Sequence, residues 1–280
     1  MRARVRSPGD SSSTGVTVAK ASFRSNDREL CVRLYTPGAI RCPGALVVLF
    51  HGGGFVRGGL DAIAATAQTM SARLGLVVAT PEYTLATVQP FPAAAEDAYA
   101  ALVWAGAAGR RRGWDAKRIA VAGEEAGGNL AAATAMMARD RGAPALAAQI
   151  LVGPMLDPSL SSPSMQRFVA NATHTPGVCG ACYRTYLPNA ADWLHPYAAP
   201  VSSTRLAGLA PALIVTCDGD PLRDEAEHYG AKLIAAGVTT QVSRQPRIEA
   251  ATHCWTGDTW TAIEGFLRSR LASPGGMSRP

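Results

Sequence analysis

One stretch of the chain, residues 119–130, constrains the fold most strongly, because an apolar strand pattern leads into a glycine-flanked turn and then into a helix pattern. It reads Ile-Ala-Val-Ala-Gly-Glu-Glu-Ala-Gly-Gly-Asn-Leu. Gly123 and Gly127 have no β-carbon, so a strand and a helix can approach closely around the residue at the turn. That residue is Glu125. The sequence therefore predicts a sharp strand–turn–helix unit with a carboxylate at its apex.

Apolar runs and helical patterns alternate on both sides of this unit. Strands are predicted at residues 16–23, 29–35, 45–50, 76–80, 149–153, 212–217 and 239–244, and helices at 61–74, 92–108, 126–139, 222–237 and 259–271. The first two strands form a hairpin. Strands that alternate with helices favour a mostly parallel sheet covered on both faces.

Composition limits the class of protein. Hydrophobic residues make up 48% of the 280 and charged residues 17%, which is typical of a globular protein. The formal charge of +6 comes from dispersed arginines, so no nucleic-acid partner is expected. No apolar run is long enough to span a membrane. The basic start leads into Ser and Gly without an apolar segment, and the six cysteines do not suggest a disulfide scaffold, so we expect a cytoplasmic protein.

The alternation breaks after the strand at 149–153, in a segment rich in Pro, Ser and Gly. The predicted organisation is a disordered tail at 1–14, a core at 15–155 and 210–272, an inserted cap at 156–209, and a second disordered tail at 273–280. The cap carries one Cys-x-x-Cys pair, Cys179 and Cys182, with His174 before it. One such pair is not a zinc site, which usually needs four ligands, so we expect no metal.

Four motifs along the chain resemble those of the hormone-sensitive-lipase-like branch of the α/β-hydrolases, the bacterial HGGG esterases. They are His-Gly-Gly-Gly-Phe at 51–55, Gly-Glu-Glu-Ala-Gly-Gly-Asn at 123–129, Asp-Pro-Leu-Arg-Asp-Glu at 220–225, and His253. Their order and spacing match the family. The resemblance implies an α/β-hydrolase fold with an eight-stranded, mostly parallel sheet, helices on both faces and a small inserted cap.

The resemblance also assigns roles to residues. It implies an oxyanion hole formed by backbone N–H groups of Gly53, Gly54 and Ala126. It implies that Asp220 and His253 are the acid and the base of a catalytic triad, with Asp220 holding the imidazole in one orientation. Neither a cofactor nor a metal is implied.

Glu125 stands where the family carries its serine nucleophile, so the serine acyl-enzyme route is closed at this position. A base beside an oxyanion hole is the equipment for proton abstraction next to a carbonyl. We therefore expect Glu125 and His253 to act as an acid–base pair on a carbonyl-containing small molecule, by cyclisation, elimination, dehydration or isomerisation. The resemblance implies specialised-metabolite biosynthesis, because this branch includes members recruited as dehydratases and cyclases.

Three other interpretations stay open. Glu125 could serve a hydrolase of an ester, lactone or epoxide, as nucleophile or as water-activating base. The protein could be a catalytically inactive esterase relative that binds a small molecule, or an esterase whose serine was replaced by design. A homodimer is also left open. The predicted substrate pocket is lined by His51, Phe55, Glu124, Trp255 and Tyr186.

Overall fold

The computed structural model describes residues 15–167, 174–246 and 254–271. Its centre is one eight-stranded sheet in the order β1-β2-β4-β3-β5-β6-β7-β8. The strands are β1 (Val16–Ser25), β2 (Arg28–Pro37), β3 (Gly44–Phe50), β4 (Val77–Pro81), β5 (Trp114–Glu124), β6 (Ala148–Val152), β7 (Ala212–Cys217) and β8 (Thr240–Gln245). The pairs β1–β2 and β2–β4 are antiparallel and the remaining pairs are parallel, which confirms the predicted fold class.

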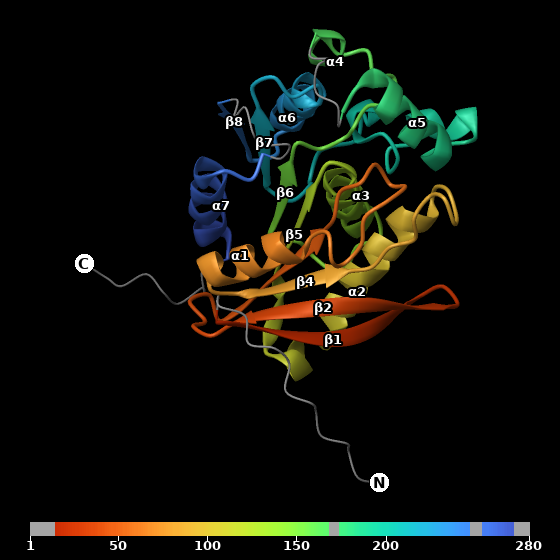
Figure 1. Ribbon diagram of the computed structural model, residues 1–280. Helices are drawn as coiled ribbons and strands as arrows, with labels where there is room; N and C mark the ends of the chain where they lie inside the picture. The colour runs from red at the N-terminus through yellow and green to blue at the C-terminus, as the bar shows by residue number, and fades with distance from the viewer. Residues whose placement is uncertain (1–14, 168–173, 247–253, 272–280) are drawn as a thin grey trace.

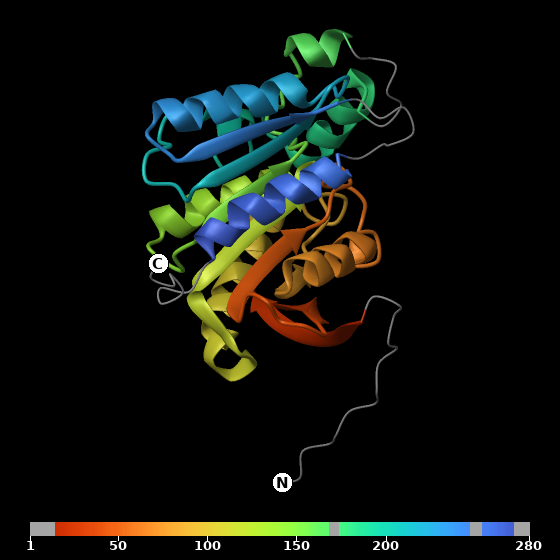
Figure 2. The ribbon, with the colours of Figure 1, turned by 90° about the vertical axis from the view of Figure 1, so that its left-hand side faces the viewer.

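Helices cover both faces of the sheet (Figure 1, Figure 2). Helices α2, α3 and α6 pack on one face, and α1 and α7 pack on the other. The helices are α1 (Ala64–Leu74), α2 (Ala93–Arg112), α3 (Ala126–Asp140), α4 (Pro163–Arg167), α5 (Pro176–Tyr186), α6 (Arg223–Ala235) and α7 (Gly257–Arg270), with short 3-10 turns at Ala190–Leu194 and Pro200–Ser202. Within the described residues, no helix combines the length and the apolar character needed to cross a bilayer.

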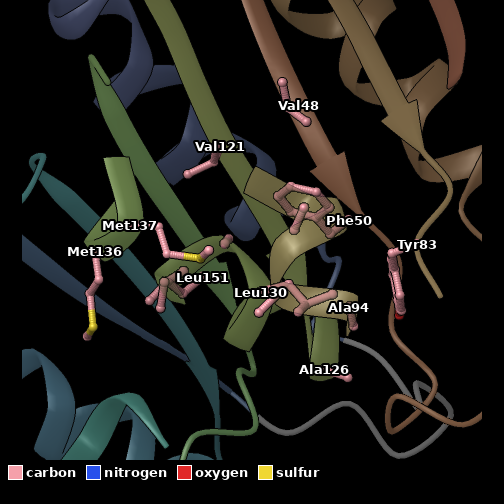
Figure 3. Close-up of a cluster of buried hydrophobic side chains, with 14 of the residues drawn as sticks. Val48, Phe50, Tyr83, Ala94, Val121, Ala126, Leu130, Met136, Met137 and Leu151 are labelled. Atoms are coloured by element: carbon pink, nitrogen blue, oxygen red, sulfur yellow. The ribbon is translucent and has the colours of Figure 1, made fainter. Parts of the chain in front are cut away.

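The central strands are buried because both of their faces are covered. In β3, every residue after Gly44 is buried, which explains the continuous apolar run in the sequence. Helix α3 is buried along most of its length and is rich in alanine, so its axis lies close to the sheet. Figure 3 shows the result: Val48, Val121 and Leu151 from three strands pack with Leu130 and Met137 from α3.

The connection between β6 and β7, residues 153–211, is here called the cap segment. It carries α4, α5 and the two 3-10 turns, and it lies beyond the ends of the strands, above α3 in Figure 1. The predicted cap bounds of 156–209 fall inside this connection and stay a prediction.

A buried polar cluster ties the β1–β2 hairpin to α2 and to the loop after β4. The Asp97 carboxylate is fully buried, and it accepts a bond from the Thr84 backbone N–H at 2.8 Å and one from Arg28 Nη2 at 3.0 Å. Thr84 follows Tyr83, whose ring packs against the glycine loop after β3. The cluster therefore supports that loop from behind.

We expect Asp97→Ala to lower the free energy of unfolding by about 3 kcal/mol, because it leaves Arg28 and the Thr84 donors without their acceptor in a buried place. Asp61→Ala is the matched control. Asp61 pairs with Arg33 at 2.6 Å, but its side chain is 92% exposed, and an exposed pair contributes less than about 1 kcal/mol. Urea unfolding measures both, and equal losses would contradict the assignment.

Candidate active site

The turn between β5 and α3 places Glu125 in a conformation that few residues with a side chain adopt. Its backbone angles are φ 52° and ψ −116°. A β-carbon on Gly123 would lie 2.0 Å from the carbonyl oxygen of Gly127, and one on Gly127 would lie 2.3 Å from that of Phe50. Both positions therefore require glycine, as the sequence predicted. A strained residue of this kind persists only where its surroundings hold it firmly.

Two groups from distant parts of the chain contact the Glu125 carboxylate. The backbone N–H of Gly53 donates to Oε2 at 2.7 Å, and Nε2 of His174 lies 3.7 Å from Oε1. Gly53 belongs to the glycine loop after β3, whereas His174 comes from the cap segment just before α5. The Glu125 carboxylate, at the turn between β5 and α3, thus contacts both the glycine loop and the cap segment.

Two of the residues predicted to form an oxyanion hole, Gly53 and Gly54, lie beside this carboxylate. Gly53 and Gly54 both have positive φ, at 113° and 60°. A β-carbon on Gly53 would lie 2.3 Å from the Arg57 carbonyl oxygen, so glycine is required there too. The Gly53 N–H is already engaged by Glu125. Within the described parts of the chain, the N–H groups of Gly54 and Ala126 have no backbone acceptor. Their role as donors to a ligand oxygen stays a prediction.

His174 bridges two carboxylates. Its Nδ1 lies 3.6 Å from Oδ1 of Asp220, and its Nε2 faces Glu125, with the residue only 7% exposed. Burial lowers the pKa of His174. The interaction with Asp220 and the charge of Glu125 outweigh burial and a smaller opposing effect of Arg57, so the net pKa is raised above its ordinary value. The arrangement stabilises an imidazolium between two anions.

Sequence reasoning did not assign His174 a catalytic role. The cap segment has no strand–helix periodicity that would place a side chain, and no motif surrounds this histidine. Its position depends on how the chain returns over the sheet, which only the folded structure shows.

Asp220 lies just beyond the end of β7, where the motif predicts the triad acid. Its carboxylate is nearly buried, Oδ1 accepts the backbone N–H of Leu222 at 3.0 Å, and Oδ2 faces Sγ of Cys254 at 3.7 Å. His253, the predicted base, lies outside the described residues. Its pairing with Asp220 therefore stays a prediction.

A small cavity of about 30 Å³ lies beside these groups. One water needs about 10–15 Å³, so the cavity has room for about two. Among the predicted pocket residues, Glu124 and Trp255 line it, and the Trp255 indole N–H donates to the Glu124 carboxylate. The full lining is Glu124, Glu125, Val152, Gly153, His174, Asp220, Cys254 and Trp255. Within the described parts of the chain, no three His, Cys, Asp or Glu side chains are arranged to hold a metal ion.

The other three predicted pocket residues lie in the protein interior instead. His51 stacks on Tyr83 with ring centroids 4.1 Å apart, its Nδ1–H donates to the Gly52 carbonyl at 2.7 Å, and burial lowers its pKa. Phe55 and Tyr186 are fully buried and stack on each other at 3.8 Å. These rings pack behind the glycine loop and the cap segment, so they support the site without lining this cavity.

Comparisons with known proteins agree with this geometry. The family model described as alpha/beta hydrolase fold matches residues 47–256. The chain is 37% identical over 249 residues to carboxylesterase NlhH of Mycobacterium tuberculosis, covering 88% of this chain and 74% of that protein. It is 39% identical over 246 residues to esterase LipI of the same organism, covering 86% and 76%. A hyperthermophilic esterase structure from the archaeon Pyrobaculum calidifontis matches with a TM-score of 0.82 and 33% identity, covering 91% of this chain and 85% of that one.

The chain therefore belongs to the α/β-hydrolases, in their hormone-sensitive-lipase-like esterase family. The predicted lyase, isomerase or cyclase in specialised-metabolite biosynthesis is wrong, because the similar proteins and structures are named esterases, which are hydrolases. A carboxylate beside backbone amides suits either kind of chemistry. The residues alone therefore could not separate the two.

We expect His174→Gln to destabilise the protein more at about pH 5.5 than at about pH 9. The raised pKa means that the protonated ring stabilises the folded state. That contribution is complete below the ordinary histidine pKa of about 6.5 and is lost as the pH rises through the folded-state pKa. Urea unfolding at the two pH values measures the difference. His228→Gln, at an exposed position on α6, is the control and should show no such trend. A larger loss at the higher pH would refute the imidazolium assignment.

Proposed function

We propose that the protein hydrolyses small carboxylic esters, with Glu125 in place of the family's serine as the base that activates water. One observation carries this proposal. The Glu125 carboxylate lies between the Gly53 N–H and the His174 ring, beside a cavity with room for about two waters. The esterase relatives support the ester as substrate.

In this proposal, a water in the cavity attacks the ester carbonyl while Glu125 Oε1 removes its proton. The negative charge that develops on the carbonyl oxygen is received by the N–H groups of Gly54 and Ala126. Ala126 is the first residue of α3, so the positive end of the helix dipole adds to the stabilisation.

His174 supplies the proton that the leaving alkoxide needs. Its imidazolium form is stabilised by the carboxylates on both sides, and its Nε2 already faces Glu125. Asp220 acts as a positioning residue, because it contacts the opposite ring nitrogen. The motif assigns this proton to His253, which lies outside the described residues; among the described residues, His174 lies beside Glu125 and Asp220.

A water-activating base is chemically preferable to a nucleophile at this position. Attack by the carboxylate on an alkyl ester gives a tetrahedral intermediate with two leaving groups, the carboxylate and the alkoxide. The carboxylate is far the better leaving group, so the intermediate would return to the ester.

We expect Glu125→Gln to lower kcat/KM for p-nitrophenyl acetate by about 100-fold to 10,000-fold, because the amide cannot take the proton of water. The matched control is Glu264→Gln. This partly exposed carboxylate on α7 pairs with Arg73 on α1 and does not line the cavity. It should keep wild-type kinetics.

Hydrolysis in oxygen-18 water then distinguishes the two roles of Glu125, base and nucleophile. With Glu125 as base, label enters only the product acid. With Glu125 as nucleophile, repeated turnover exchanges label into the Glu125 carboxylate, seen as a mass increase in its peptide. Label in that peptide would overturn the water-activation route. Absence of any hydrolysis by the wild type would overturn the proposed function.

A comparison of leaving groups separates the two histidines. We expect His174→Gln to slow hydrolysis of ethyl esters at least about tenfold more than hydrolysis of p-nitrophenyl esters, because p-nitrophenolate leaves without a proton. The measurement is the ratio of kcat/KM for the two substrates, with His228→Gln as control. If His253→Gln changes this ratio and His174→Gln does not, the proton donor is His253.

A further inference from the structure

Two cysteine thiols lie beside the candidate active site. Cys217 ends β7, and Cys254 comes just before α7, so the fold brings together two residues that are far apart in the sequence. Both belong to the same apolar cluster, and the Cys254 S–H donates to the Asp220 carboxylate at 3.7 Å. Neither thiol takes part in the proposed hydrolysis.

The pairing follows from the side-chain alternation of β7. Leu213, Val215 and Cys217 point to the face of the sheet that α7 covers, and Cys254 lies buried in the same apolar cluster. Cys254 also lies beside the turn after β6, because a β-carbon on Gly153 would be 3.5 Å from its sulfur. Both thiols therefore lie in one apolar cluster between the sheet and the start of α7.

The two thiols differ in the way that a reactive and a resolving cysteine differ. The hydrogen bond from Cys254 lowers the pKa of Cys217, which outweighs burial and the nearby acids Asp220 and Asp218. The pKa of Cys254 is strongly raised, first by donating that bond and then by burial. Cys217 is only partly buried, so a small oxidant can reach it.

We propose that Cys217 and Cys254 are a redox-sensitive pair that forms a reversible disulfide when the protein meets hydrogen peroxide. The Cys217 thiolate attacks one peroxide oxygen, the O–O bond breaks, and Cys217 becomes a sulfenic acid as the first water is released. The Cys254 sulfur then attacks the Cys217 sulfur, the S–O bond breaks, and the Cys254 proton leaves with the hydroxide as the second water. Two thiols lose two electrons in total, and one peroxide gains them.

The Cys179 and Cys182 pair on α5 is less suited to this chemistry. Burial raises the pKa of both thiols, so both remain protonated and unreactive towards peroxide. Both also lie buried on one helix, α5, and neither lines the cavity beside Asp220.

The disulfide would act on the site through Asp220. Cys254 would lose the S–H that faces Asp220 Oδ2, and its sulfur would turn from the cavity wall towards Cys217. Formation of the bond does not depend on the proposed ester hydrolysis. Its effect on catalysis does rest on that function.

The test treats the reduced full-length protein with a small excess of hydrogen peroxide, blocks the remaining thiols with N-ethylmaleimide, and reads the intact mass. The chain has six cysteines, and we expect two fewer adducts after oxidation, all recovered with dithiothreitol. Peptide mapping should show Cys217 joined to Cys254. Cys42→Ser, a matched control elsewhere in the chain, should still lose two adducts between the oxidised and reduced samples.

Two variants keep the test decisive. Cys217→Ser should abolish the paired loss, and Cys254→Ser should leave a Cys217 sulfenic acid that dimedone labels. A paired loss that persists in Cys217→Ser, or a crosslink that maps to Cys179 and Cys182, overturns the proposal. Oxidation should also lower hydrolysis of p-nitrophenyl acetate at least about threefold, reversibly. An absence of hydrolysis in the reduced protein counts against the proposed function alone, because the adduct count reads the disulfide independently.

Discussion

The bond from the Gly53 N–H to the Glu125 carboxylate, 2.7 Å long, is the interaction on which the rest of the site depends. It joins the turn after β5 to the glycine loop after β3, and these two strands are neighbours in the sheet. Glu125 can reach that amide because its positive φ turns the side chain out over the ends of the strands. Without this turn, the carboxylate would follow the strand alternation into the core.

The turn between β5 and α3 depends on small residues, which allow the helix backbone to lie close to the neighbouring strands. Gly127 packs against the Phe50 carbonyl, and the alanines of α3 keep that helix close to the sheet. Such close packing makes the base of the site rigid, which favours fixed distances between reacting groups. The cap segment then adds a side chain of different origin, His174, to this rigid base.

Much of the fold was predictable because apolar periodicity reports which faces are covered. The continuous run in β3 and the alternation in β1 and β2 gave both strand types correctly. Glu125 and Asp220 were predicted from their motifs, and both follow strands whose carboxyl ends share one edge of the sheet.

The contributions of the cap segment were not predictable. A histidine in an irregular segment carries no periodic signal, so His174 could be placed only by the fold. Phe55 and Tyr186 show the converse problem. An aromatic residue beside a glycine loop can face a ligand or the core. The two rings stack on each other with centroids 3.8 Å apart, so both belong to the core. The reaction class was not readable either, since the same groups serve hydrolysis and proton abstraction.

The carboxylate that occupies the glycine loop also determines which ligands the site tolerates. In an amide-lined hole that is empty, an anion such as a carboxylic acid product is held by the N–H groups. Here an anionic oxygen of the protein itself already takes the Gly53 amide. A second anion would meet like charge at short range in a poorly hydrated place, where repulsion is strong. The loop therefore binds a fully ionised acid less well than a neutral ester.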